Sequence, residues 1–339
     1  MKACFITKCG DVDTIQIGEQ PDPKIGQSQV LIGIKSAALN HLDIWVRMGR
    51  PGMVMPFPHI LGSDSAGVII ETGAEVTKAK VGDEVAVYPG IHYEYYSSLR
   101  VDEEPYGILG LTKPGVFAEY VVVDENCVFP KPHHLTFQET AAVPIPYLTA
   151  WRMLFTKGNL QPGETVLIHG IGGGVAQAAL SLALTAGAEV IVTSSSSEKL
   201  RRAAELGAHH TINYMRDDIV QHVLAITQGV GVNLALDAVG AKTMPVNIEC
   251  TCRQGRITLC GVTTGQEVPV DLQTIYWKQL QIFGSTMGSI EEFCQVLSAL
   301  TATNGKPVID SEYTIDDVQK ATQRMEDGKQ FGKIVLNIS

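Results

Sequence analysis

The 339-residue sequence has few charged and few aromatic residues, and it contains no long apolar run. Charged residues make up 18% and aromatic residues 6% of the chain. No segment reaches the roughly 20 apolar residues that a membrane-spanning helix needs, and the first residues, MKACFITKCG, lack the apolar core of a signal peptide. We therefore expect a cytoplasmic protein that does not contact a membrane.

Basic residues are also scarce. Lys and Arg number 26 against 36 Asp and Glu, which gives a formal net charge of -10. Because no lysine or arginine run relieves this charge, we exclude nucleic acid as a partner. The 7 cysteines are scattered, and the closest pair, Cys250 and Cys252, is too tightly spaced for a usual zinc site. We predict reduced, mostly buried thiols, with this pair on a helix.

The arrangement of apolar runs changes near residue 132. Before it, short β-like runs alternate with Gly, Pro and Asp turns. After it, apolar strands such as TVLIHG and EVIVTS each precede a helical pattern, and this alternation predicts a parallel sheet. Beyond about residue 285 strand and helix signals mix again. We predict two domains, with the tail returning to the first.

A glycine cluster follows the strand TVLIHG and leads directly into the helical pattern AQAALSLAL. It contains Gly172, Gly173 and Gly174, and then Val175 and Ala176, the last of which stands where the usual fingerprint has its third glycine. Glycines there let backbone N–H groups and the helix N-terminus approach a pyrophosphate. We predict a dinucleotide-binding loop, and the alternative is a glycine turn with a structural role only.

The end of the next strand indicates which dinucleotide is bound. An NAD enzyme usually has an acidic residue there, but this chain has Thr193, Ser194, Ser195 and Ser196. Lysine and arginine side chains follow within the next helix, and these can neutralise a 2'-phosphate. We therefore predict NADP(H) as cofactor. The alternative is that Ser197 caps a helix whose basic residues form a solvated face.

Several blocks of sequence, in this order, resemble the medium-chain dehydrogenase/reductase superfamily, which contains zinc alcohol dehydrogenases and zinc-independent quinone oxidoreductases. They include SAALNHLDIWVRMG, PFPHILGSDSAGVIIETGAEVTKAKVGDEV, GVFAEYVVV, AAVPIPYLTAW, the glycine loop, LDAVG and FGKIVL. The resemblance implies an α/β protein in which a Rossmann domain, with a doubly wound parallel sheet (132–285), is inserted in a GroES-like, mainly β catalytic domain (1–131 and 286–339). It also implies a homodimer or homotetramer.

The resemblance assigns cofactor contacts at matched positions. It places Thr149 near the nicotinamide, His41 at the pyrophosphate, Lys199 and Tyr214 at the 2'-phosphate, and Lys333 near the entrance of the cofactor cleft. Together with the residues of the two loops, the predicted cofactor-binding set is His41, Thr149, Gly172, Gly173, Gly174, Val175, Ser194, Ser195, Lys199, Tyr214 and Lys333.

The positions that hold zinc in the alcohol dehydrogenases have changed. Two cysteines and a histidine of that family correspond here to Asn40, Ser63 and Ile145. An amide and a hydroxyl are weak ligands for zinc and isoleucine is none, so we expect no catalytic zinc. The proton-relay positions hold Leu42 and Trp45, so the alcohol-oxidising relay is absent as well.

Three further features belong to the same region. The lobe that carries a structural zinc in the family matches YPGIHYEYYSSLRVDEEPYGILG, and its cysteine positions hold Tyr93, Tyr96 and Leu99. Asp43 is expected to accept hydrogen bonds from the backbone or from Arg47. Asp64 replaces a glutamate behind the zinc, and without zinc it needs a new partner or a raised pKa.

Without a metal, developing negative charge on oxygen must be stabilised by hydrogen-bond donors, and this favours a quinone, an enone or another small carbonyl compound. We predict hydride transfer from NADPH with Asn40 and Ser63 donating to the substrate oxygen, and a catalytic set of Asn40, Ser63, Asp64 and Thr149. Two alternatives stay open: an alcohol dehydrogenase with an unconventional metal site that uses His41 and Asp64, and a non-catalytic NADPH-binding protein.

Overall fold

The computed structural model describes residues 1–49, 55–91 and 107–338. The chain forms two compact units: Met1–Ile145 together with Ser289–Ser339, and Pro146–Gly288. The second unit is thus an insertion in the first, as the sequence analysis predicts. The residues Tyr93, Tyr96 and Leu99 of the altered lobe lie outside the described residues.

The first unit is built around a mainly antiparallel sheet with strand order β10-β6-β5-β3-β18-β17, and β9 also pairs with β3. Residues of β3 alternate between buried and half-buried, so one face of the sheet packs into the core, which includes Ile32 and Ile34. The strands are β3 (Gln29–Ala38), β5 (Asp64–Thr72), β6 (Glu84–Val87), β9 (Tyr120–Asp124), β10 (Val128–Pro130), β17 (Ile309–Thr314) and β18 (Lys333–Asn337).

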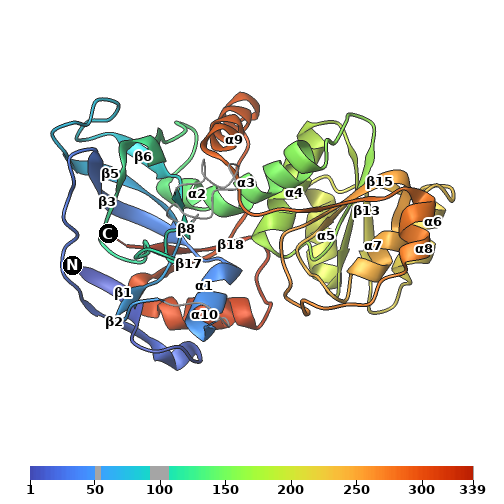
Figure 1. Cartoon of the computed structure of the whole chain (residues 1–339), viewed down its shortest axis with the longest axis horizontal. Coiled ribbons are helices and arrows are strands. Elements are labelled where there is room, and N and C mark those ends of the chain that lie inside the picture. Colours follow the sequence, from blue (N-terminus) through green and yellow to red (C-terminus); the bar gives the residue numbers. More distant parts are fainter. Residues whose placement is uncertain (50–54, 92–106, 339) are drawn as a thin grey trace. The chain divides into compact units, whose positions relative to one another are not determined.

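Smaller elements complete this unit. A second sheet has the order β2-β1-β4, and β7 pairs with β8. The strands are β1 (Lys2–Ile6), β2 (Ile15–Glu19), β4 (His59–Ile60), β7 (Gly90–Ile91) and β8 (Gly107–Ile108), and the α-helices are α1 (His41–Met48), α2 (Phe137–Ala141), α9 (Ile290–Thr303) and α10 (Val318–Glu326). Figure 1 shows α1 and α10 near one another, and the two helices are in contact.

The second unit contains a parallel sheet with strand order β13-β12-β11-β14-β15-β16. This order, in which the chain begins in the middle and winds outward in both directions, is that of a Rossmann domain. The strands are β11 (Thr165–Ile168), β12 (Glu189–Ser194), β13 (His210–Asn213), β14 (Val232–Asp237), β15 (Thr251–Leu259) and β16 (Gln281–Gly284). The predicted fold class is confirmed.

Helices connect the strands of this sheet, as parallel strands require. They are α4 (Gly174–Thr185), α5 (Ser197–Glu205), α6 (Ile219–Ile226), α7 (Met244–Cys250) and α8 (Leu272–Lys278), and α3 (Pro144–Trp151) precedes β11. No helix in the described part of the chain is both long enough and apolar enough to span a membrane.

The boundary near residue 132 differs from the prediction. Residues 132–145 belong with the first unit, because α2 contacts β3 and β5 and its Ala141 packs with Ala38, Ala66 and Val335. The helical pattern of this segment resembles that of the following domain, so composition alone misplaces it. At the other end, residues 286–288 belong with the second unit.

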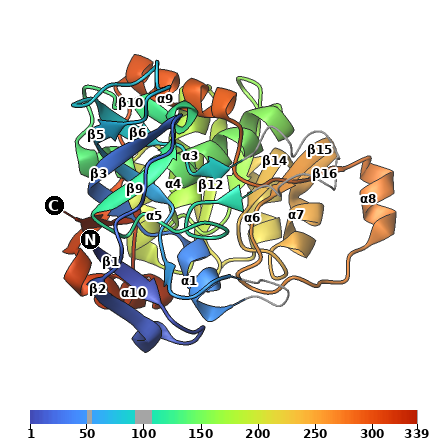
Figure 2. The ribbon, with the colours of Figure 1, turned by 60° about the vertical axis from the view of Figure 1, so that its left-hand side comes forward.

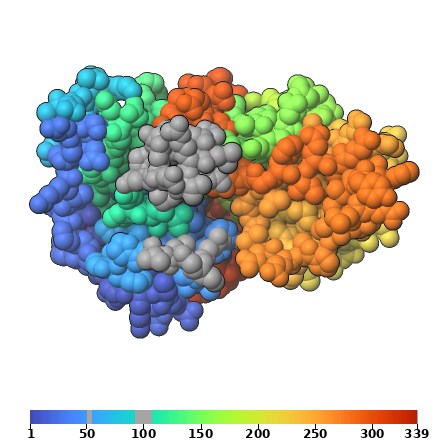
Figure 3. Space-filling view, viewed as in Figure 1, coloured from blue at the N-terminus to red at the C-terminus, as the bar shows by residue number. Residues whose placement is uncertain are grey.

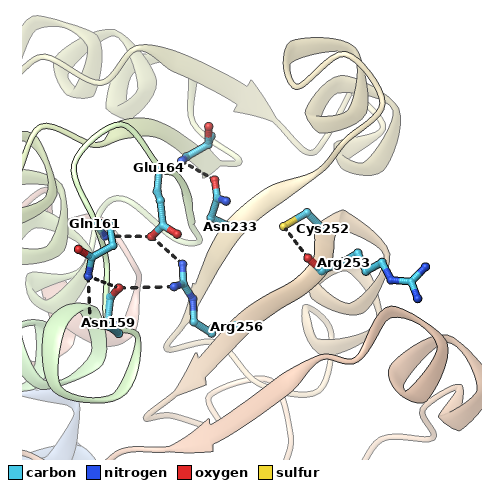
Figure 4. A network of polar contacts seen from close by, with 8 residues as sticks. Asn159, Gln161, Glu164, Asn233, Cys252, Arg253 and Arg256 are labelled. Atoms are coloured by element: carbon cyan, nitrogen blue, oxygen red, sulfur yellow. Dashed lines mark hydrogen bonds and ion pairs between the residues drawn. The ribbon is translucent and has the colours of Figure 1, made fainter.

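A polar network joins the loop before β11 to residues of β14 and β15 in the second unit (Figure 4). The guanidinium of Arg256 donates to Glu164 at 2.6 Å, and Glu164 also accepts from the backbone of Gln161 at 2.9 Å. Asn233 accepts from the backbone of Thr165 at 2.9 Å. The glycine loop follows the opposite end of β11, so this network is remote from the predicted cofactor loop.

All seven cysteines are free thiols. Cys4, Cys250 and Cys252 are buried, whereas Cys9 and Cys294 are exposed. Cys250 ends α7 but Cys252 lies in β15, so the prediction that both lie on one helix is wrong, because the chain turns directly from helix to strand at Thr251.

Candidate functional site

The first candidate half-site lies where β3 ends and α1 begins. Asn40 directly precedes α1, and its backbone N–H donates to Asp43 Oδ2 at 2.7 Å. An acceptor three residues into a helix satisfies one of the free donors at its start. Because this interaction uses the backbone of Asn40, its side-chain amide is left to bond elsewhere.

Asp64 holds one side of the Asn40 amide. It is the first residue of β5, lies opposite Ala38 of β3, and is fully buried. Its Oδ2 accepts from Asn40 Nδ2 at 2.9 Å, and its Oδ1 accepts from the backbone of Ile145 at 2.8 Å. The carboxylate that backs the zinc in the family thus orients an amide here.

Lys333 holds the other side of the amide. Its Nζ donates to Asn40 Oδ1 at 2.7 Å, to Leu39 O at 2.6 Å and to Asp64 Oδ2 at 3.1 Å. The side chain is only 5% exposed. Because β18 is paired with β3, the first side chain of β18 is placed beneath the end of β3. The structure thus gives Lys333 three acceptors inside the first unit, and its place near the entrance of a cofactor cleft stays a prediction.

Electrostatics around this cluster follow from burial. Burial raises the pKa of Asp64, and the charge of Lys333 opposes the shift. Burial also raises the pKa of Asp43 to about 7, against hydrogen bonds from the backbone that lower it. The sequence analysis required a new partner or a raised pKa for Asp64, and the structure confirms both.

His41 and Arg47 behave differently from each other. His41 is exposed at the start of α1, yet surrounding protein displaces enough water to lower its pKa, and the charge of Lys333 adds to this. Arg47 is buried and pairs with Glu326 of α10, so it is not the partner of Asp43. Thus α1 is held to α10 by one end and to β5 and β18 by the other.

The predicted donor role of Ser63 is not supported by its surroundings. Ser63 is fully buried, and its hydroxyl donates to the carbonyl oxygen of Leu109 at 2.7 Å. A serine hydroxyl has one proton to donate. Since that proton is engaged inside the fold, Asn40 is the residue of this pair that is left to act on a substrate.

No group of three or more His, Cys, Asp or Glu side chains in the described part of the chain could hold a metal ion. The alternative metal site from His41 and Asp64 is disfavoured by geometry as well. Both oxygens of Asp64 accept hydrogen bonds from protein groups, and one of these donors is an ammonium ion. A second cation at that carboxylate would be repelled by the first.

The second candidate half-site is the loop between β11 and α4. Gly173 caps α4 without any side-chain hydrogen bond, so the N–H groups of the first helical turn have no side-chain acceptor. Gly170 has a φ of 68°, which allows the sharp turn after β11. Free N–H groups at the start of a helix bind phosphate oxygens, so the predicted loop of Gly172, Gly173, Gly174 and Val175 fits a pyrophosphate.

The loop after β12 carries the predicted 2'-phosphate contacts. Ser194 is buried and accepts from the backbone of Ser196, and Ser196, not Ser197, caps α5 by accepting from Lys199 N. Ser195 is exposed. This arrangement leaves the hydroxyl of Ser195 facing solvent at the end of the strand.

Charges near this loop are mixed. Arg201 pairs with Glu198 at 2.7 Å and also with Glu205, so its charge is compensated on the helix surface.

Two other predicted cofactor residues differ in exposure. Tyr214, just beyond β13, is 46% exposed. Thr149 lies in α3 and is 5% exposed. The cofactor roles of Lys199, Tyr214 and Thr149 stay predictions.

A buried hydrogen-bond chain lies beneath both loops, and the sequence analysis missed it. The ring of His169, directly after β11, contacts Thr193 Oγ1 at 3.1 Å and Asn247 Oδ1 at 2.8 Å. Asn247 Nδ2 donates to Asp237 Oδ2 at 2.6 Å. The motif LDAVG, which contains Asp237, is the feature of the sequence that could have indicated this hydrogen-bond chain. The chain links the ends of three strands that surround the predicted cofactor loop.

Comparison with known proteins identifies the family. Residues 26–133 match the alcohol dehydrogenase GroES-like domain, and residues 174–302 match the zinc-binding dehydrogenase domain. The chain belongs to the medium-chain dehydrogenase/reductase superfamily and is an oxidoreductase of that group. A zinc-type alcohol dehydrogenase-like protein of Schizosaccharomyces pombe is 33% identical over 322 residues, covering 93% of this chain and 92% of the relative.

Other relatives have different names. A quinone oxidoreductase-like protein 2 homolog of Nematostella vectensis is 28% identical over 92% of this chain and 82% of its own length. A solved structure of an NAD-dependent alcohol dehydrogenase, 35% identical, superposes with a TM-score of 0.93 and full coverage of both chains. The family binds a nicotinamide cofactor, and its members differ in substrate and cofactor.

Proposed function

We propose that this protein is an NADPH-dependent oxidoreductase that reduces a quinone, an enone or another small carbonyl compound without a catalytic zinc ion. This proposal rests on the hydrogen bonds of the Asn40 side-chain amide. Asp64 and Lys333 hold it from both sides, and among the described residues no acceptor bonds its second Nδ2 hydrogen. The amide therefore has one N–H group to offer to a substrate oxygen.

The residues at the former zinc position do not fit zinc. The oxygen of Asn40 already accepts from an ammonium ion, and Ser63 is hydrogen-bonded to Leu109. Ile145 contributes only its backbone N–H, which donates to Asp64. Zinc sites in proteins are built from thiolate, imidazole and carboxylate ligands, and a positive charge 2.7 Å from the amide oxygen opposes a divalent cation.

The residues of the second unit fit a nicotinamide dinucleotide. The uncapped start of α4 would hold the pyrophosphate, and Ser195, Lys199 and Tyr214 would contact a 2'-phosphate. The absence of a carboxylate at the end of β12 favours NADPH over NADH. When bound, NADPH supplies the hydride that adds to the electrophilic carbon of the substrate.

The chain's own contribution is to stabilise charge. Hydride addition to an enone moves an electron pair through the conjugated system onto the carbonyl oxygen, and Asn40 donates to that oxygen. Water then supplies the proton that completes the saturated ketone or, for a quinone, the hydroquinone. Delocalised charge needs less stabilisation than that of a simple alkoxide, so one amide donor is sufficient for these substrates.

The experiment is NADPH oxidation by 2-cyclohexen-1-one and 1,4-benzoquinone, with NADH as competitor and metal analysis of the same protein. Asn40→Ala should lower kcat by about a hundredfold, the cost of losing one such donor, without changing the Kd for NADPH. Ser63→Ala is the matched control and should keep kcat. Stoichiometric zinc in the active protein would overturn the metal-free reaction, and tight NADPH binding without turnover would support a non-catalytic role.

We also infer that the protein is a homo-oligomer that associates through β16 and α8. β16 is the edge strand of the parallel sheet, and α8 has no buried residue. Figure 2 shows α8 beyond β15 and β16, and Figure 3 shows the residues of this region at the surface. Large apolar side chains are exposed here: Leu272 by 70%, Tyr276 by 63%, Trp277 by 70% and Ile282 by 41%.

A second copy of the chain suits this surface. An edge strand can pair with its own symmetry mate in antiparallel fashion, because a two-fold axis makes the same patch complementary to itself. The charges nearby are satisfied internally: Lys278 donates to three backbone carbonyls, and Asp271 caps α8. These two side chains therefore add little local repulsion to a contact formed here.

Sedimentation of the Trp277→Lys variant tests this surface. The variant should sediment as a smaller species than the wild-type chain, because a charge is introduced into an apolar contact. Met215→Lys is the matched control, since Met215 is 73% exposed on the same unit but lies outside the patch. An unchanged sedimentation coefficient for Trp277→Lys would place the contact elsewhere, and a monomeric wild-type chain would refute the association.

A further inference from the structure

We propose that Lys333 is a positioning residue that strengthens Asn40 as a hydrogen-bond donor, by placing a positive charge on the oxygen of the Asn40 amide. This inference rests on the proposed function, in which Asn40 donates to the substrate oxygen. It assigns to Lys333 the electrostatic task that the metal ion performs in zinc-dependent relatives, carried out through an amide.

The contacts of Lys333 are complete and fixed. An ammonium group has three hydrogens, and Nζ has three acceptors: Leu39 O at 2.6 Å, Asn40 Oδ1 at 2.7 Å and Asp64 Oδ2 at 3.1 Å. The strand that begins with Lys333 is paired with β3, and the backbone N–H of Leu39 donates to Ile334 O at 3.0 Å. The charge is therefore held by the sheet itself and does not move to meet a ligand.

An amide responds to a charge on its oxygen. A cation there favours the resonance form in which the nitrogen carries positive charge, and the N–H groups become better donors. Asp64 fixes the plane of the amide by accepting one of the two hydrogens at 2.9 Å. The second Nδ2 hydrogen is therefore the stronger donor that remains for a substrate. Its direction is set by the contacts of the amide with Asp64 and Lys333.

The layering of the cluster matches this role. Asp64 is fully buried and Lys333 is 5% exposed, whereas Asn40 is half-buried. The charged pair thus lies behind the amide and away from solvent, where electrostatic effects are least screened. A buried ion pair is a weak source of stability by comparison with apolar packing of the same volume, so stability alone does not account for placing it under Asn40.

A four-variant cycle tests whether Lys333 acts through Asn40: wild type, Asn40→Ala, Lys333→Met and the double variant. With 2-cyclohexen-1-one, Lys333→Met should lower kcat by about tenfold, less than the loss of the donor itself. The double variant should be no slower than Asn40→Ala, because the charge has no effect once the amide is gone. The Kd for NADPH should stay unchanged in all four proteins, and a Kd raised by Lys333→Met would overturn the inference by showing that Lys333 contacts the cofactor instead.

The matched control is Lys131→Met. Lys131 is also mostly buried in the first unit, with 10% of its side chain exposed, and it contacts Glu84 at 3.2 Å and not Asn40. It should cost stability without changing kcat. If Lys333→Met does not fold, the double variant Asp64→Asn/Lys333→Met replaces it, because this variant removes both buried charges at once. The cycle then compares this double variant with and without Asn40→Ala. Independent, multiplicative losses in kcat would overturn the inference.

A second readout does not depend on turnover. In protein labelled with [15N]asparagine, the side-chain N–H signals of Asn40 are identified by their loss in Asn40→Ala. Lys333→Met should move them upfield, since the amide is less polarised, and Lys131→Met should leave them in place. If the wild-type protein reduces neither acceptor, the proposed function fails while this shift still decides the role of Lys333. Unmoved signals would overturn that role even in an active enzyme.

Discussion

His169 Nε2 and Asn247 Oδ1 lie 2.8 Å apart, at the centre of the buried hydrogen-bond chain of the second unit. Because the amide nitrogen of Asn247 donates to Asp237 at 2.6 Å, its oxygen faces the ring, and Nε2 must carry the proton. Nδ1 then accepts from the hydroxyl of Thr193 at 3.1 Å. One neutral histidine therefore joins the strand before the glycine loop to the strand before the serine loop.

Asn247→Leu should lower the free energy of unfolding by about 1–3 kcal/mol, because it leaves an N–H of His169 buried without a partner. It also removes one of the two donors to Asp237 Oδ2, which keeps the hydroxyl of Thr243 at 2.7 Å. Urea denaturation followed by circular dichroism measures this. Gln221→Leu, which removes an exposed amide from α6, should change the unfolding midpoint little. Equal midpoints for the two variants would show that the chain contributes nothing to stability.

Lys199→Gln should weaken NADPH binding about tenfold and leave NADH binding unchanged, since a charge-assisted hydrogen bond to a 2'-phosphate is worth about 1.5–3 kcal/mol. Titration with both cofactors gives the ratio of the two Kd values. Arg253→Gln serves as control because Arg253 is exposed on β15, away from the serine loop. Parallel losses for both cofactors would argue against 2'-phosphate recognition.

Asp43 should make stability depend on pH. Its pKa is raised from 3.8 to about 7 in the folded chain, so the folded state holds a proton that the unfolded state releases. The free energy of unfolding should therefore fall as the pH rises from about 4 through about 7. Asp43→Asn should flatten this part of the profile, whereas Asp11→Asn, at an exposed carboxylate, should preserve it. Superimposable profiles for wild type and Asp43→Asn would contradict the shift.

Ser63→Ala should lower the free energy of unfolding by about 1 kcal/mol, the usual value of one internal hydrogen bond. Its kcat should stay within about twofold of the wild type, because the hydroxyl is fully buried and bonded to Leu109. Steady-state kinetics with either acceptor and a urea titration measure the two effects. A loss of kcat as large as that of Asn40→Ala would restore Ser63 to the reacting centre.

The fold was accessible from sequence because its signals are local. Strands such as TVLIHG and EVIVTS are continuous apolar runs, as expected for strands buried on both faces of a parallel sheet. The boundary at residue 145 was not accessible. Ala141 belongs with the first unit through contacts with Ala38 and Val335. The pattern of residues 132–145 does not predict these contacts, because the contacting residues are distant in sequence.

The candidate site was accessible only in part. The replacement of zinc ligands at Asn40 and Ser63 is visible in the sequence, and so is the need of Asp64 for a new partner. That the partner is Lys333, 269 residues away, depends on the pairing of β18 with β3. Ser63 was misjudged for a similar reason, since a hydroxyl next to a motif looks available until the tertiary acceptor, Leu109, is known.

The distribution of the thiols has a practical consequence for spectroscopy. The two exposed cysteines, Cys9 and Cys294, both belong to the first unit, whereas in the second unit Cys250 and Cys252 are buried and Cys260 is half-buried. A maleimide dye applied to the folded wild-type chain should therefore label the first unit in preference to the second. Two of the three native tryptophans, Trp151 and Trp277, belong to the second unit. In a variant with Trp45 replaced, energy transfer from them to the dye would report changes in the distance between the two units during cofactor uptake.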